Sequence, residues 1–162
     1  MSASASQSVV ETVLDRFGKT VTEKIVDEKK MVKIVVEKES VKVVALYLRD
    51  NFGFDHVKAV SGVDLSKLLK KEEKIEVIYH VGSYSRPELH KTDVGLSVKL
   101  DKANPRMPSL TEVWPSSEYH EREVYEMFGV VFEGHPDLRR LLLPEYWNDI
   151  PPMLKEYEPP GR

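Results

Sequence analysis

Hydrophobic residues recur at helical spacing near the start of the chain, which predicts an amphipathic helix there. The apolar side of this helix consists of Val9, Val10, Val13, Leu14 and Phe17. Gly18 follows and can take the left-handed conformation that ends many helices. A second helix is expected over residues 41–53, because Ser40 can cap its start and Gly53 can end it.

Runs of β-branched residues predict five strands. The first two runs cover 19–26 and 31–39, and the polar link Asp27–Lys30 suggests that they form a hairpin. Three more strands are expected within 54–65, 74–82 and 93–100. The last of these alternates Val94, Leu96, Val98 and Leu100 with Gly95, Ser97 and Lys99, a pattern typical of a half-buried strand.

These elements predict an α+β fold with two layers, in which a small mixed or antiparallel sheet carries helices on one face. We expect this globular domain to span residues 1–113. Residues 114–162 would then form a helix and an extended, proline-rich C-terminal arm.

Prolines become frequent after Asp101, and they divide the C-terminal third into short pieces. Ser109 can cap one helical turn that Pro115 stops, and Ser116 or Ser117 can cap a helix that runs to Gly129. Beyond Gly134 the prolines exclude a long helix or a central strand. This segment is nevertheless rich in large apolar residues, namely Leu141, Leu142, Leu143, Tyr146, Trp147, Met153, Leu154 and Tyr157. It should therefore lie extended on a surface, either its own or a partner's.

The helix before Gly129 has two distinct sides. One side is apolar, whereas Glu118, Arg122 and Glu126 share the other, where Arg122 can bridge two carboxylates on a solvated face. Glu121 falls on the apolar side and needs a partner there. We expect that partner to be Arg139 or Arg140.

The charged residues around this helix allow three interpretations. A catalytic one pairs Glu121 or Glu123 with His120 or His135 as general acid and base. A metal-binding one uses His120, Glu123 and His135, since a His and a Glu three apart on a helix can share an ion. In the third, His120 is a half-buried core residue and His135 turns the chain before Pro136.

Composition narrows the function classes. The 162 residues carry a net charge of −3 with Lys and Glu interspersed, so no basic patch favours nucleic acid. The absence of Cys leaves no disulfide, iron–sulfur ligand set or thiolate zinc site within the chain. The sequence lacks a secretory signal and an apolar run that could cross a bilayer, which favours the cytosol. The Lys/Glu-rich composition is in keeping with a thermophile.

The segment EREVYEMFGVVFEGHPDLRRLLLPEYW, followed by PPMLKEY, resembles the signature of the 30-kilodalton family. Its members are the 30-kilodalton subunits of respiratory complex I, the proton-translocating NADH:quinone oxidoreductase, and of related redox complexes. The signature positions are Glu121-Arg122-Glu123, Glu126-Met127-Phe128-Gly129, Phe132, Gly134-His135-Pro136-Asp137 through Arg140, Trp147 and Pro152 through Tyr157. The chain departs from many complex I members after the Trp, where it reads Asn148-Asp149-Ile150-Pro151.

The resemblance implies a non-catalytic core subunit in the peripheral arm of a membrane-associated redox complex that uses NADH, ferredoxin or a deazaflavin as donor. It implies no active site, cofactor or metal in this chain. The partners would be a large subunit with the quinone or [NiFe] site and a small iron–sulfur subunit, on the cytoplasmic face of the membrane. Alternatives are the equivalent subunit of a membrane-bound [NiFe] hydrogenase or sulfur-reducing complex, and a free-standing metal-dependent enzyme.

On this basis we expect the C-terminal arm to be the docking surface. The charged contacts would come from Arg139, Arg140 and Lys155, and the aromatic anchors would be Tyr146, Trp147 and Tyr157.

Overall fold

The computed structural model describes residues 2–26, 31–68 and 72–160, and its elements follow the predicted order. The helices are α1 (Ser2–Phe17), α2 (Val41–Phe52) and α3 (Glu118–Phe128), with short 3₁₀ helices at Pro87–Leu89 (η1) and Pro115–Ser117 (η2). The strands are β1 (Val21–Val26), β2 (Met31–Val36), β3 (His56–Asp64), β4 (Lys74–Gly82), β5 (Asp93–Asp101), β6 (Arg106–Pro108) and β7 (Val131–Glu133).

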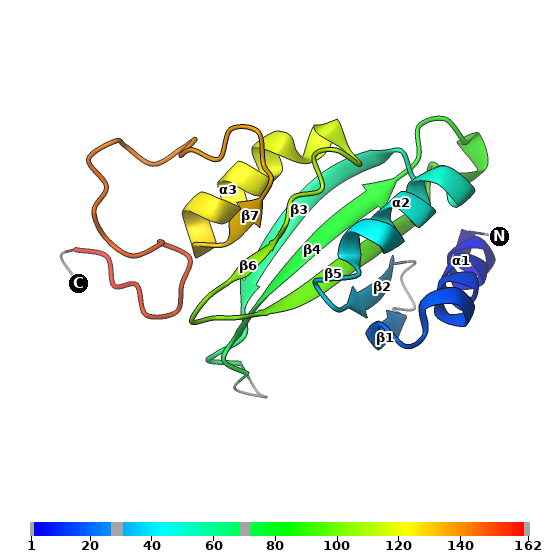
Figure 1. The fold of residues 1–162 in the computed structure, drawn as a ribbon, viewed down its shortest axis with the longest axis horizontal. Helices are drawn as coiled ribbons and strands as arrows, with labels where there is room; N and C mark the ends of the chain where they lie inside the picture. The colour runs from blue at the N-terminus through cyan, green and yellow to red at the C-terminus, as the bar shows by residue number, and fades with distance from the viewer. Residues whose placement is uncertain (1, 27–30, 69–71, 161–162) are drawn as a thin grey trace.

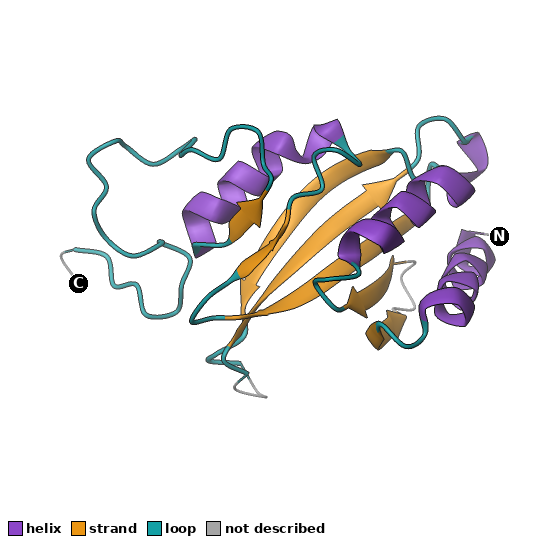
Figure 2. Ribbon diagram, in the orientation of Figure 1, coloured by secondary structure: helices purple, strands orange, loops and turns teal. Residues whose placement is uncertain are grey.

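Five strands form a mixed sheet in the order β1-β2-β5-β4-β3. Only the β2–β5 pair is parallel, because α2 and the β3–β4 hairpin separate these two strands in the chain. The helices cover one face of this sheet (Figures 1 and 2), which confirms the predicted two-layer α+β fold. β1 and β2 pair antiparallel as expected, while the link Asp27–Lys30 lies outside the described residues.

Two sequence-based details differ in the structure. Gly95 and Ser97 are buried, so β5 is not half-exposed. The reason is its central position, where Ser97 Oγ donates to Glu76 Oε1 at 2.6 Å and Lys33 Nζ pairs with the same oxygen at 2.6 Å. Ser40 occupies the N-cap position of α2, but its side chain makes no capping hydrogen bond.

A second, two-stranded sheet was not predicted. β6 and β7 are parallel, pair from Arg106–Val131 to Pro108–Glu133, and bracket α3 in the chain. Each has only three residues, too few to give a periodic signal, and β6 contains a proline. The pair ties the chain after α3 back to the segment that follows β5.

The hydrophobic core runs without a break across the predicted boundary at residue 113. Trp114 is fully buried, and its Nε1 donates to the carbonyl of Phe54 at 2.8 Å. Phe128 of α3 packs over Gly62 of β3, where no Cβ holds the ring away. Residues on both sides of position 113 therefore share one core. Among the described residues, no helix is both long and apolar enough to cross a membrane.

Candidate docking surface and the contacts that shape it

Glu121 is the polar centre of the junction between α3 and the sheet. Its side chain is fully buried, and its carboxylate accepts hydrogen bonds from Tyr79 OH (2.9 Å), Ser109 Oγ (2.6 Å) and the Leu110 N–H (2.9 Å). Ser117 Oγ lies 3.2 Å from the same carboxylate. This one group therefore links β4, the loop after β6 and α3.

The predicted ion pair between Glu121 and Arg139 or Arg140 is wrong. The carboxylate lies on the core side of α3 as expected, but its partners among the described residues are neutral hydroxyls and a backbone N–H. Burial raises the pKa of Glu121 above its ordinary value, and the hydrogen bonds from Ser109, Leu110 and Tyr79 offset part of the rise. Burial also raises the pKa of Tyr79, and the negative charge of Glu121 adds to that rise.

Arg122 and Glu126, one turn apart on α3, hold the chain that follows β7. The Nε and Nη2 atoms of Arg122 donate to the carbonyls of Arg139 and Arg140, each at 3.0 Å. Glu126 accepts the backbone N–H groups of the three residues Leu141–Leu143, with Leu141 at 3.1 Å and Leu142 at 2.8 Å. We call this pair of side chains the clamp.

The clamp corrects the prediction that this side of α3 is solvated. Arg122 is 7% exposed and Glu126 is 5% exposed, because residues 139–143 lie over them. Arg122 therefore binds backbone carbonyls where bridging of Glu118 and Glu126 was expected. Five backbone polar groups, one from each of residues 139–143, are satisfied in this way without helix or strand structure.

The histidines of the metal and catalytic interpretations are engaged elsewhere. His135 Nδ1 accepts the Asp137 N–H at 3.0 Å, which leaves Nε2 to donate to the Glu118 carbonyl at 3.0 Å. His135 thus turns the chain before Pro136, as the third interpretation proposed. His120 is half-buried and Glu123 is exposed. Within the described part of the chain, no cluster of three or more His, Cys, Asp or Glu side chains could hold a metal ion.

The remaining signature residues shape the same region. Gly129 and Gly134 have positive φ angles of 76° and 83°, a conformation that favours glycine, and Gly129 ends α3. Phe128 is buried and Asp137 accepts a hydrogen bond from Arg139 Nε at 2.9 Å, whereas Pro136 is exposed.

A second anchor holds residues 153–156. The Met153 N–H donates to the Met127 carbonyl at 3.0 Å, and the Lys155 N–H donates to Asp64 Oδ2 at 2.9 Å. Lys102 joins them, with Nζ 2.8 Å from both Asp64 Oδ2 and Glu156. Sequence reasoning missed Asp64 and Lys102, which come from the ends of β3 and β5 and carry no local signal of this contact.

Asp64 is ionised in this anchor. Burial alone would raise its pKa, but hydrogen bonds from Lys102, the Lys155 N–H and Ser66 hold the pKa of Asp64 well below its ordinary value.

Between the two anchors, residues 144–152 swing away from α3 and return to it (Figure 1), and we call this segment the arch. Trp147 makes its contacts within the tail. Its ring centroid lies 5.6 Å from that of Tyr157, and its Nε1 donates to the Asp149 carbonyl at 3.1 Å. Arg140 Nη1 donates to the Trp147 carbonyl at 2.6 Å. Tyr146 is 84% exposed.

The predicted interface residues thus fall into two groups. Arg139, Arg140, Tyr146 and Lys155 are exposed, whereas Trp147 and Tyr157 are half-buried and contact each other. Lys155 is also held through its backbone, because Lys67 Nζ donates to its carbonyl at 2.7 Å.

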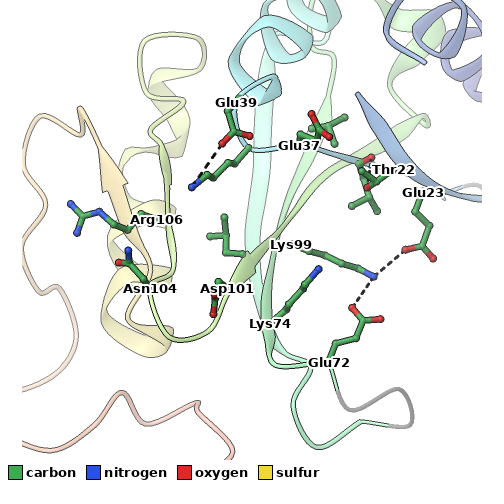
Figure 3. Close-up of a pocket in the computed structure, with 14 residues that line it drawn as sticks. Thr22, Glu23, Glu37, Glu39, Glu72, Lys74, Lys99, Asp101, Asn104 and Arg106 are labelled. Carbon is green, nitrogen blue, oxygen red and sulfur yellow. Dashed lines mark hydrogen bonds and ion pairs between the residues drawn. The ribbon is translucent and has the colours of Figure 1, made fainter. Parts of the chain in front are cut away.

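An open groove of about 710 Å³ lies near the ends of β2 and β5. Figure 3 shows that charged side chains of both signs line it, and that Lys99 points toward Glu23 and Glu72. Lys99 Nζ lies 3.1 Å from Glu23 and 3.3 Å from Glu72, and Arg106 pairs with Glu133. Lys99 and Arg106, two cations of the groove, are thus paired with neighbouring acids.

Comparison with known proteins places the chain in a family. The profile described as "Respiratory-chain NADH dehydrogenase, 30 Kd subunit" matches residues 34–162. The C subunit of the NADH-quinone oxidoreductase of Roseiflexus sp. (strain RS-1) is 37% identical over 145 residues, covering 86% of this chain and 79% of the relative. The C subunit of the F(420)H(2) dehydrogenase of Methanosarcina mazei is 29% identical over 153 residues, covering 94% and 92%.

Two solved structures share the fold. A trypsin-resistant fragment (1–134) of Nqo5 has a TM-score of 0.68 at 27% identity, covering 80% of this chain and 99% of that chain. A chain of the archaeal membrane-bound sulfane sulfur reductase has a TM-score of 0.70 at 22% identity, covering 94% and 85%. The matched family profile extends over most of the chain and includes α3, the clamp and the tail. This chain therefore belongs to the family of the 30 Kd subunit of respiratory-chain NADH dehydrogenase.

Proposed function

We propose that this chain is a non-catalytic subunit of a membrane-associated, complex I-like oxidoreductase, and that its C-terminal tail (residues 134–160) docks on a large partner subunit. The observation that carries the proposal is the distribution of exposed apolar side chains. Nine large hydrophobic residues are exposed among those described, and Leu141, Leu142, Tyr146, Ile150 and Met153 are five of them. Apolar surface gathered in one segment is typical of a site that a partner covers.

The chemistry of the chain supports a scaffolding role. The buried carboxylates of the described residues, Asp64, Glu76, Glu121 and Glu126, are engaged by protein donors from within the chain. The cavity between the arch and α3 measures about 160 Å³, smaller than the roughly 300–1,000 Å³ typical of sites for small molecules. The groove near β2 and β5 is within that size range at about 710 Å³, but its Lys99 and Arg106 are paired with neighbouring acids. In this proposal the redox groups, iron–sulfur clusters with a quinone or [NiFe] site, belong to the partner subunits.

The partner subunits and the location that we propose are supported by membership in this family. The large quinone-site subunit and a small iron–sulfur subunit are the expected neighbours, on the cytoplasmic face of the membrane. The relatives include subunits of both NADH-quinone oxidoreductases and an F(420)H(2) dehydrogenase, so the electron donor is a property to be measured on the assembled complex.

Affinity purification of the tagged chain from gently solubilised membranes of its own cells tests the proposal. The expected result is a stoichiometric large subunit of the quinone-site class, an iron–sulfur subunit and donor:quinone activity. A [NiFe] large subunit would instead assign the chain to the hydrogenase branch. Recovery of the chain alone, or a stoichiometric metal in the purified single chain, would overturn the proposal.

A further inference from the structure

The tail contains no helix or strand after β7 in the described residues, yet two separate sets of contacts fix its path. The clamp holds residues 139–143 on α3, and Asp64 with Lys102 holds Lys155 and Glu156 near the ends of β3 and β5. A loop fixed at both ends loses less conformational entropy when it binds than a free chain of the same length.

The clamp also decides which way the side chains of its segment face. Arg122 and Glu126 bind only the carbonyl and N–H groups of residues 139–143, so the side chains of that segment stay free of the clamp. Leu142 is accordingly 61% exposed, and Arg139 retains 75% exposure of its side chain while pairing with Asp137.

The two neighbouring aromatic residues of the arch, Tyr146 and Trp147, face different surroundings. Trp147 packs against Tyr157 and hydrogen-bonds to the carbonyls of Asp149 and Ile150, so this ring stabilises the loop itself. Tyr146, the adjacent residue, is the most exposed large hydrophobic side chain of the described residues. Its neighbours in sequence are Glu145 and Trp147, and Pro144 stiffens the approach to it.

We infer that the tail is a preformed docking element whose shape is fixed by the clamp and Asp64, and that Leu142 and Tyr146 are the side chains that enter the partner. Trp147 and Tyr157 hold the arch together from within. The partner surface that fits has apolar pockets for a leucine and a tyrosine, bordered by carboxylates that meet Arg139 and Arg140. This inference rests on the proposed function, because it names the contacts by which the tail would dock.

The first test concerns the free chain and needs no partner. Hydrogen exchange of the full-length chain should show slow exchange at the Leu141–Leu143 amides. Glu126→Gln should speed that exchange at least about tenfold, since the variant replaces a carboxylate oxygen with an N–H donor that faces the same amides. Glu123→Gln is the matched control, the same change at an exposed position of the same helix, and should leave the exchange unaltered.

The second test uses the complex purified with the tagged chain, with the large subunit as the probe. Tyr146→Ala and Leu142→Ala should each weaken association at least about tenfold without lowering the melting temperature of the free chain, as expected for anchors at an interface. Tyr84→Ala is the matched control, because Tyr84 is also exposed (68%) but lies far along the chain between β4 and η1.

The outcomes separate this inference from the proposed function. Fast exchange at Leu141–Leu143 in the parent chain would overturn the preformed tail. Unchanged association of both alanine variants, combined with loss of association on removal of residues 134–162, would leave docking through the tail intact but overturn the assignment of Leu142 and Tyr146. Association that survives the truncation would overturn docking through the tail altogether.

Discussion

The two sides of α3 each bury a carboxylate, and the two carboxylates bind different kinds of donor. Glu121 faces the sheet and binds side chains and one N–H of the core, whereas Glu126 faces the tail and binds three successive backbone N–H groups. Neither has a cationic partner among the hydrogen bonds of the described residues. A buried carboxylate can therefore be satisfied by neutral hydrogen-bond donors alone. When those donors come from the core, as for Glu121, the carboxylate stabilises the core, and when they are backbone N–H groups of a loop, as for Glu126, it fixes the loop.

The largest effect should come from removing the core-facing acid. Glu121→Ala would leave the Leu110 N–H and two hydroxyls without their acceptor and open a cavity, which together cost about 3–5 kcal/mol of unfolding free energy. Urea denaturation measures this change. Glu123→Ala, at an exposed position, should stay within about 0.5 kcal/mol of the parent. A decrease of less than about 1 kcal/mol in the unfolding free energy of Glu121→Ala would contradict the argument that this carboxylate stabilises the core.

A packing change on the core side of α3 should rank next. A Cβ at Gly62 would overlap the ring of Phe128, so Gly62→Ala should displace the ring and cost about 1–3 kcal/mol. Gly82→Ala is the control within the sheet, because its Cβ would meet only the flexible end of Lys58. Thermal and urea denaturation of both variants should separate them, and equal costs would contradict the argument from close packing.

A change at the second anchor of the tail should have a smaller, more local effect. Asp64→Asn keeps one acceptor oxygen but loses the charge that binds Lys102, and should cost about 1–2 kcal/mol. Hydrogen exchange should rise at Lys155, while the Leu141–Leu143 amides on the clamp remain slow. Asp137→Asn, which alters an exposed pair with Arg139, should cost less than about 0.5 kcal/mol. Simultaneous release of both tail segments would show that the two anchors act as one unit.

The smallest effects should appear as opposite pH dependences. The folded-state pKa of Glu121 is raised, so its contribution to stability is fully present below the unfolded value of 4.5 and is lost as pH rises through the folded pKa. The folded-state pKa of Asp64 is lowered, so its contribution is present above 3.8 and is lost as pH falls. Unfolding free energies of the parent, Glu121→Gln and Asp64→Asn between about pH 1.5 and 8 should reveal these slopes. Parallel curves for the parent and both variants would contradict the assignment.

Much of the fold could be predicted because its signals are local. β-branched runs located the five strands of the main sheet, and Gly53 and Gly129 correctly ended two helices. The short strands β6 and β7 were not predicted, because three residues are too few to show an alternation of apolar and polar side chains. The burial of both faces of β5 was also not predicted, because the hydrogen-bond partner of Ser97 is Glu76, 21 residues away in sequence.

The candidate site was predicted less completely, and the reasons are physical. Helical geometry correctly put Glu121 on the apolar side and grouped Arg122 with Glu126. It could not supply the partners, because the donors to Glu121 include Tyr79, 42 residues away. A polar helix side is also equally compatible with water and with backbone groups, and here the backbone of residues 139–143 covers it.

The clamp has a consequence for how this protein can change its sequence. Because the hydrogen bonds of Arg122 and Glu126 to residues 139–143 go to main-chain atoms, many side chains in that segment should leave the clamp intact, proline at 141–143 excepted. A substitution in that segment should therefore change the surface offered to a partner, whereas a substitution of Arg122 or Glu126 should loosen the segment itself. In this way two helix residues set the path of the tail, and a different set of residues, the exposed side chains of the tail, sets what it can bind.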